Sequence, residues 1–133
     1  MRSMFYRCSS LKELNLKNFN TKNVKNMSSM FYECSSLKDI NLSNFNTNKV
    51  TDMSYMFSYF SSLEELNLFN FNTNKVKDMR NMFAGCSSLK EINLSNFTFN
   101  NKTYQNKMFS GCSEELKLKI KAQYQNIRNE AFD

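Results

Sequence analysis

Hydrophobic positions recur along this chain with a period of 26 residues. The phenylalanine column consists of Phe5, Phe31, Phe57, Phe83 and Phe109, and a methionine lies directly before each of them. Leucine and isoleucine form further columns in the same register. A repeat of this length is typical of proteins in which one unit cannot bury its own apolar face, so that stacked neighbours build a shared core.

Two hydrophobic patterns alternate within each copy. The stretch LKELNL (Leu11–Leu16) places Leu14 and Leu16 on one side and Asn15 on the other, which predicts a short strand. The stretch TKNVKNMSSMFYEC (residues 21–34) spaces its apolar residues three or four apart, which predicts a short helical segment. The residues expected to cap these segments at their N-termini are Thr21, Thr47 and Thr73.

These patterns predict an α/β solenoid of the leucine-rich-repeat type. Parallel strands, paired in register, are expected on one face, and short helical segments on the other. We expect a single domain over residues 1–133, with repeats over about 4–112 and a C-terminal cap over about 113–132. In the fourth copy, Lys102 and Gln105 stand where the others have Val and Met, and Phe99 and Tyr104 are expected to supply the missing apolar contacts.

The C-terminal tail follows a different pattern from the repeats. Its apolar stripe predicts a capping helix over the last copy, with Ser113 as the N-cap. The stripe consists of Leu116, Ile120, Tyr124, Ile127 and Ala131. A short strand over Leu116–Ile120 followed by a helix is the alternative.

The composition excludes several kinds of chemistry. The chain is 41% hydrophobic, enough for a core, but it has no histidine and only the glycines Gly85 and Gly111. No Gly-rich phosphate loop and no nucleophile–base pair can be assembled. We therefore expect no enzyme, no cofactor and no metal site. No apolar run approaches the roughly 18 residues of a membrane-spanning helix.

The cysteines Cys8, Cys34, Cys86 and Cys112 fall in one column of the repeat, without the close pairs that zinc sites use. Stacking brings Cys8 near Cys34 and Cys86 near Cys112, so a disulfide is conceivable. Phe60 occupies the same column in the third copy, which favours an apolar core column of free, buried thiols.

Two asparagine columns could serve a ligand or the backbone. Asn15, Asn41, Asn67 and Asn93 face outward on the strands, where we favour a ladder of side-chain amides over a ligand site. Asn18, Asn44, Asn70 and Asn96 are expected to bond to the turn backbone.

The net charge is +6, and its excess lies in the segments that enter the predicted helices. These hold Lys22, Lys25, Lys49, Lys75, Lys77, Arg80, Lys102 and Lys107. Such an edge could contact nucleic acid or lipid. We favour a solvated edge, because aromatic residues are few among these cations, and expect no nucleic-acid partner.

The third copy departs most from the pattern. Tyr55, Tyr59 and Phe69 replace smaller or polar residues, and Phe69 falls on the outward strand face beside Asn67. Exposed aromatics are natural anchors of an interface. Tyr55, Tyr59, Asn67 and Phe69 are therefore the candidates for protein binding, and sequence drift is the alternative.

The N-terminal end offers a second candidate surface. Met4, Phe5, Leu11 and Leu14 belong to a copy that has none before it in this sequence. An uncovered end presents apolar surface and strand edges. We expect another chain, the same end of a second copy, or further repeats to cover it.

The copies resemble the BspA-like class of leucine-rich repeats, which are bacterial surface-antigen repeats. The resemblance rests on the pattern MF, CSSL, a strand, NFNT, V, M and MF, which is matched in three consecutive units between residues 4 and about 112. It implies a solenoid without enzymatic activity that binds proteins, often at the cell surface. The N-terminus MRSMFYRCSS lacks the apolar stretch of a signal peptide.

Two functions therefore compete. The first is a non-enzymatic protein-binding or scaffold module. The second is a fragment of an exported cell-surface adhesin or antigen.

Overall fold

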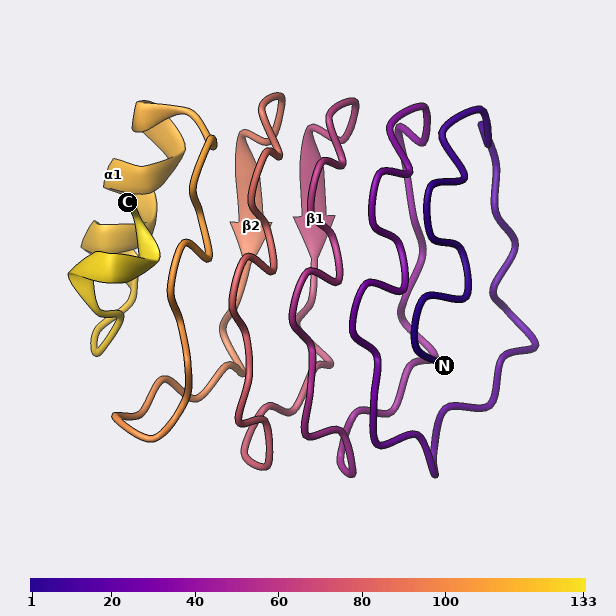
Figure 1. The fold of residues 1–133 in the computed structure, drawn as a ribbon, viewed down its shortest axis with the longest axis horizontal. Helices are drawn as coiled ribbons and strands as arrows, with labels where there is room; N and C mark the ends of the chain where they lie inside the picture. Colours follow the sequence, from indigo (N-terminus) through magenta and orange to yellow (C-terminus); the bar gives the residue numbers. More distant parts are fainter.

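The computed structural model describes residues 1–133, and the 26-residue copies lie side by side in it as successive coils (Figure 1). The third and fourth coils contribute the strands β1 (Glu65–Asn67) and β2 (Glu91–Asn93), which pair in parallel. Their register sets Leu66 beside Ile92. The predicted in-register parallel pairing is confirmed for these two coils.

The first two coils depart from the predicted sheet. Residues 13–15 and 39–41 form no strand, and 39–41 make no backbone hydrogen bond to β1. Beside the strands, the rings of Phe45 and Phe71 stack with centroids 6.4 Å apart. This separation exceeds the roughly 4.7–4.9 Å between paired strands. The rings of Phe71 and Phe97, beside the paired strands β1 and β2, stack at nearly the same spacing, 6.5 Å. Ring packing therefore does not decide which coils form strands.

The prediction of helical segments on the other face was wrong. Residues 21–34 and their counterparts in the other copies form turns. Along this turn face, backbone N–H groups alternate in direction. That of Phe31 donates to the Met56 carbonyl of the next coil at 3.0 Å, whereas that of Met30 donates to Met27 within its own turn at 3.3 Å. Turns and helices both bring side chains three or four apart to one side, so the hydrophobic spacing could not separate them.

A pair of left-handed residues in each coil explains why no helix forms. Ser29 and Glu33 have φ values of 53° and 56°. The same positions return as Tyr55 and Tyr59, Asn81 and Gly85, and Lys107 and Gly111, all with positive φ. A left-handed residue cannot continue a right-handed helix. The chain therefore bends every four residues, and half of its N–H groups reach the neighbouring coil.

The threonines predicted as N-caps instead join the coils. The Thr47 hydroxyl donates to the Asn72 carbonyl at 2.9 Å and accepts from the Asn72 N–H at 2.8 Å. Thr21 makes the same two bonds to Asn46. Both threonines are buried. With no helix to begin, their hydroxyls satisfy the backbone of the next coil.

Of the two predictions for the asparagine columns, one is wrong and one is confirmed. The amide ladder is wrong, because the Asn67 side-chain oxygen accepts from the Phe69 N–H at 3.1 Å. The same bond, to the residue two positions on, is made by Asn15, Asn41 and Asn93. The turn role is confirmed for Asn44, whose amide donates to the carbonyls of Leu16 and Phe19 in the previous coil.

The core runs through all coils as one cluster of 33 buried residues. Its centre is the predicted phenylalanine column, in which successive rings from Phe5 to Phe109 stack with centroids 5.5–5.8 Å apart. Burying a Phe contributes about 1.5–3 kcal/mol. The repetition of the sequence thus builds a continuous aromatic stack.

The C-terminal cap is confirmed in its first half. Helix α1 (Glu114–Gln123) begins at Ser113, whose hydroxyl accepts from the Leu116 N–H at 3.2 Å. The helix ends earlier than predicted, and the chain turns back into the 3₁₀ helix η1 (Asn129–Ala131). Phe132 then stacks on Phe109 with ring centroids 5.4 Å apart.

Candidate interaction surfaces

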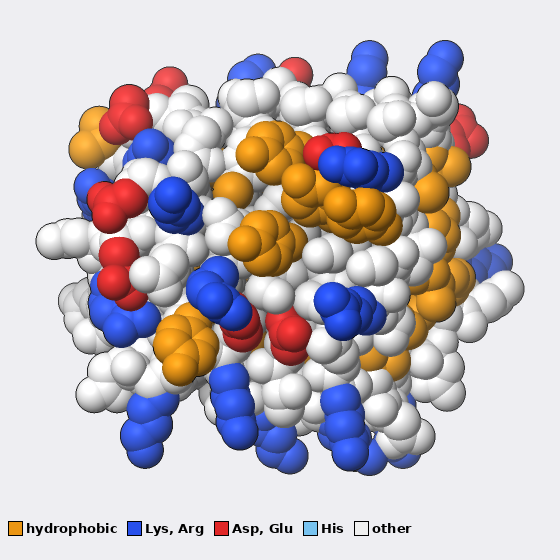
Figure 2. All heavy atoms as spheres, viewed as in Figure 1, with side chains coloured by type: hydrophobic (Ala, Val, Ile, Leu, Met, Phe, Trp, Pro, Cys, Tyr) orange, Lys and Arg blue, Asp and Glu red, His pale blue; other side chains and the backbone are white.

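Four tyrosines gather on the turn face. Tyr6 and Tyr32 belong to one column of the first two coils, and their rings stack with centroids 4.9 Å apart. The ring of Tyr32 also meets that of Tyr59 edge-on at 5.7 Å and that of Tyr55 at 6.4 Å. Tyr6, Tyr55 and Tyr59 are exposed and Tyr32 is half-buried. These four residues are called the tyrosine patch, and hydrophobic side chains cluster on this face in Figure 2.

The backbone fixes where two of these rings lie. Tyr55 and Tyr59 occupy the left-handed positions of the third coil, with φ values of 58° and 57°. Gly85 holds the equivalent of Tyr59 in the next coil, and a Cβ there would lie only 2.5 Å from Cδ1 of Tyr59. The absence of a side chain at Gly85 therefore makes room for the Tyr59 ring.

Charged side chains border the tyrosine patch. Arg7 pairs with Glu33 at 2.9 Å, and its guanidinium carbon lies 5.3 Å from the centre of the Tyr6 ring. Burial and the neighbouring Glu33 raise the pKa of Tyr32. Like an unperturbed tyrosine, Tyr32 is protonated at neutral pH, so its hydroxyl can donate a hydrogen bond. The patch combines aromatic surface with polar groups at its rim.

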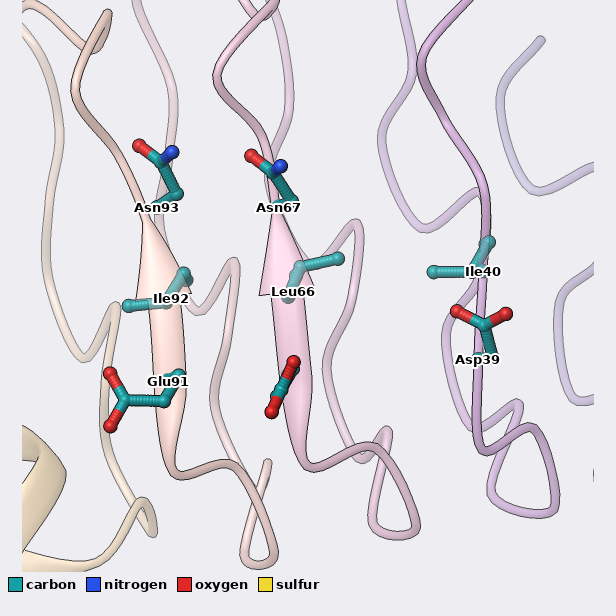
Figure 3. Close-up of a pocket in the computed structure, with 8 residues that line it drawn as sticks. Asp39, Ile40, Leu66, Asn67, Glu91, Ile92 and Asn93 are labelled. Atoms are coloured by element: carbon teal, nitrogen blue, oxygen red, sulfur yellow. The ribbon is translucent and has the colours of Figure 1, made fainter.

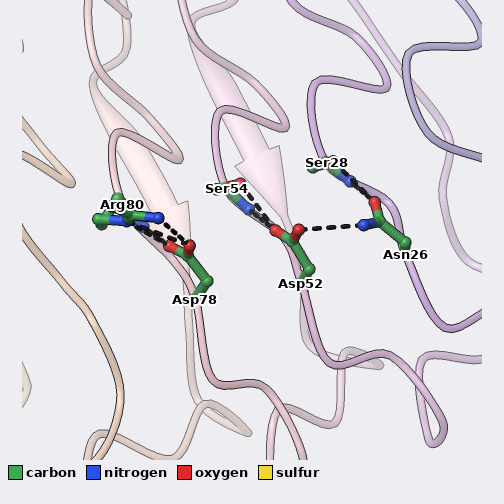
Figure 4. A network of polar contacts seen from close by, with 6 residues as sticks. All are labelled: Asn26, Ser28, Asp52, Ser54, Asp78 and Arg80. Atoms are coloured by element: carbon green, nitrogen blue, oxygen red, sulfur yellow. Dashed lines mark hydrogen bonds and ion pairs between the residues drawn. The ribbon is translucent and has the colours of Figure 1, made fainter.

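A ladder of polar side chains crosses the same face (Figure 4). Isolated parallel bridges join Asn26 to Asp52 and Asp52 to Asp78. The Asn26 amide donates to Asp52 at 3.0 Å, the Ser54 hydroxyl donates to Asp52 at 2.7 Å, and Arg80 pairs with Asp78 at 2.6 Å. The Asn26–Asp52 bond joins two coils, whereas the Ser54 and Arg80 side chains bind a carboxylate of their own coil. Both carboxylates therefore have donors on this face.

The other two candidates from the sequence lie on the strand face. Asn67 ends β1, and Phe69 follows it with 49% of its surface exposed. An open groove of about 360 Å³ lies between residues 39–40 and the two strands (Figure 3). The carboxylates of Asp39, Glu65 and Glu91 line it. The structure therefore brings Tyr55 and Tyr59 together but separates them from Asn67 and Phe69.

The sequence missed two members of the tyrosine patch, Tyr6 and Tyr32. They directly follow Phe5 and Phe31 of the phenylalanine column, so neither stands out as a departure from the repeat. The signal that could have found them is the change along their column, which holds tyrosine in the first two copies and the small residues Ser58 and Ala84 in the next two. Only the stacking of coils shows that Tyr32 contacts Tyr55 and Tyr59 of the next copy.

The cysteine column consists of free thiols. Cys34, Cys86 and Cys112 are buried, as predicted, whereas Cys8 is only half-buried. The thiol of Cys86 donates to the Phe57 carbonyl at 3.1 Å. The column thus belongs to the core, and no group of three or more Cys, Asp or Glu side chains is arranged to hold a metal ion.

The N-terminal coil has an open outer face. Met4 is 47% exposed, and Phe5, Leu11 and Leu14 are half-buried. Phe5 stacks on Phe31 on one side only, with ring centroids 5.6 Å apart. Met4 is thus exposed in the first coil, and the other three residues keep part of their surface accessible.

Comparison with known proteins places the chain in a family. Residues 1–122 match the family described as "Mycoplasma protein of unknown function, DUF285". The chain belongs to this family. No curated protein matches it.

A solved structure extends the comparison. The chain is similar to a leucine-rich cell surface protein from Faecalibacterium prausnitzii A2-165, with a TM-score of 0.51 and 24% identity. The alignment covers 81% of this chain and 26% of the other, so this member of the DUF285 family spans about a quarter of that protein's length. The likeness supports a leucine-rich-repeat relationship in fold. In this DUF285 chain, no helix is both long and apolar enough to cross a membrane.

Proposed function

We propose that this chain is a non-enzymatic solenoid module that binds another protein through the tyrosine patch. The observation that carries the proposal is the contact of Tyr32 with Tyr6, Tyr55 and Tyr59 on a face held by hydrogen bonds between coils. Tyrosine is enriched at interfaces because its ring buries apolar area while its hydroxyl can bond. A rigid cluster of such rings loses little entropy on binding.

A role at the cell surface is part of the proposal. Its support is the similarity to a protein named as a leucine-rich cell surface protein. The alternative function, a part of an exported adhesin or antigen, has the same support. Labelling of intact cells with an antibody against the chain tests the location. Signal only after the cells are opened would contradict both surface roles.

The binding role is tested with matched variants of the two faces. Tyr55→Ser with Tyr59→Ser removes the centre of the tyrosine patch, and Phe69→Ser removes the exposed aromatic of the strand face. Immobilised wild type and both variants are incubated with the same cell extract, and retained proteins are quantified. We expect a protein held by wild type and by the Phe69 variant but lost from the double tyrosine variant. Loss from the Phe69 variant alone would place binding on the strand face instead.

A further inference from the structure

Six lysines, equal in number to the excess of basic over acidic residues, lie along one edge of the stack. The four turns that follow the strand face, residues 20–25, 46–51, 72–77 and 98–103, hold six lysines and no acidic residue. We call this set the basic edge: Lys22, Lys25, Lys49, Lys75, Lys77 and Lys102. The whole chain has 18 basic and 12 acidic residues, so the net charge of +6 equals that of the basic edge alone. Blue side chains project from the lower rim in Figure 2.

These lysines are free to meet a ligand. All six are exposed, and none takes part in an ion pair. The ammonium group of Lys49 contacts only the Asn23 side-chain oxygen, at 2.7 Å. On the opposite edge, by contrast, Lys90 pairs with Glu64 at 2.8 Å. Arg80, which the sequence grouped with the basic edge, is neutralised by Asp78.

The shape and polarity of the basic edge indicate an anionic ligand bound by charge. A hollow of about 590 Å³ lies between its third and fourth turns, lined by Lys75, Lys77 and Lys102 with asparagine and threonine side chains. The valines of these turns contribute little surface, since Val50 and Val76 are buried. Among the apolar residues of these turns only Val24 keeps part of its surface accessible, so the lysines dominate what the edge offers to a ligand.

We propose that the basic edge docks on an anionic phospholipid bilayer. Lysines recur in each of the four turns along this edge, so a plane of headgroups can meet several of them together. The turns of the basic edge hold no arginine for bidentate phosphate contacts. The one exposed ring beside Lys77, Tyr104, lies 5.5 Å from the Arg80 guanidinium carbon, and a single ring gives successive bases no stacking platform. These absences disfavour a nucleic acid. The tyrosine patch lies on another face, so docking does not depend on the protein-binding role.

Flotation with lipid vesicles at low ionic strength tests the inference. The wild-type chain is mixed with vesicles of phosphatidylcholine alone or with added phosphatidylglycerol. We expect binding only to the anionic vesicles, and its loss as salt rises, because exposed charges are screened. Each lysine near an anionic surface contributes roughly fivefold in affinity. Lys75→Gln with Lys102→Gln should therefore weaken binding about 25-fold.

A control of equal charge separates the edge from the net charge. Lys12→Gln with Lys38→Gln removes two exposed lysines from the opposite edge and should change affinity far less. Equal losses in the two variants, or no binding of wild type to anionic vesicles, would overturn the inference. Tighter binding to single- or double-stranded DNA than to the vesicles would overturn it in favour of nucleic acid. Tyr55→Ser with Tyr59→Ser should bind vesicles as wild type does.

Discussion

At the scale of single residues, the cysteine column shows how stacking changes side-chain chemistry. Cys34 and Cys112 each donate a hydrogen bond to a carbonyl of the previous coil, at 3.2 and 3.3 Å. Burial raises the pKa of both thiols from 9.0 to about 11. Burial also raises the pKa of Cys86, which lies between coils on both sides. The native state therefore holds these protons more tightly than the unfolded chain does.

We predict that this retention makes the fold sensitive to alkaline pH. The contribution of the thiols to stability is fully present below pH 9.0, where both states are protonated, and is lost as pH rises toward about 11. Urea unfolding at several pH values in this window measures it. Cys34→Ala with Cys112→Ala should reduce the decline in unfolding free energy between pH 9.0 and 11. Declines of the same size in variant and wild type would contradict the prediction.

At the scale of elements, the sequence predicted what repeats and missed what the backbone does between repeats. The 26-residue columns identified Met27, Met30 and Phe31 as core, and all three are buried. Their spacing fits a helix and a run of turns equally well, and the choice depends on hydrogen bonds to coils that no single copy contains. Side chains identify the buried positions of such a fold, but neighbouring coils decide its backbone.

The fourth copy shows the same limit. Phe99 is buried, as expected, but Tyr104 is 59% exposed. Gln105 is buried instead, and its side-chain oxygen accepts from the Arg128 N–H at 3.1 Å. A polar residue was thus tolerated in the core because the returning C-terminal segment supplies a donor, which lies 23 residues away in the chain.

A prediction at this scale concerns the left-handed positions. Lys107 is exposed and has a φ of 56°, and its side chain forms no hydrogen bond or ion pair. Its neighbour Asn106 is not among the residues with positive φ and serves as the control. Glycine adopts positive φ without strain. Lys107→Gly relieves roughly 1–2 kcal/mol of left-handed strain but adds the entropic cost of glycine, roughly 0.5–1 kcal/mol, so it should stabilise the protein by about 0.5–1 kcal/mol. Asn106→Gly carries the entropic cost alone and should destabilise the protein by roughly 0.5–1 kcal/mol. Thermal unfolding of both variants checks the signs, and a lower Tm for Lys107→Gly would show that the left-handed conformation carries no strain.

At the scale of the whole molecule, the stack of coils has a direction. On the turn face, most N–H groups that cross between coils donate to carbonyls of the next coil, as from Ser29 to Ser54 at 2.9 Å. The N–H groups of Thr51, Lys77 and Tyr104 donate back to the previous coil. The last coil has no further repeat, and there the N–H groups of Lys107 and Phe109 donate to the carbonyls of Glu130 and Ala131, both at 2.7 Å. The segment after α1 thus takes the place of a further coil. Phe132 lies 23 residues after Phe109 rather than 26, so the repeat pattern did not predict that it continues the phenylalanine column.

The last prediction concerns the C-terminal segment that takes the place of a further coil. Phe132 is buried and stacks on Phe109, so Phe132→Ala should remove aromatic packing and uncover the end of the core. We expect a loss of about 3–5 kcal/mol in unfolding free energy, as for other buried Phe truncations. Leu118→Ala, on the exposed side of α1 at 66% exposure, is the control and should change stability by less than about 0.5 kcal/mol. Urea denaturation followed by circular dichroism gives both values. If the two variants unfold at the same urea concentration, α1 alone covers the last coil and the segment around η1 does not act as its continuation.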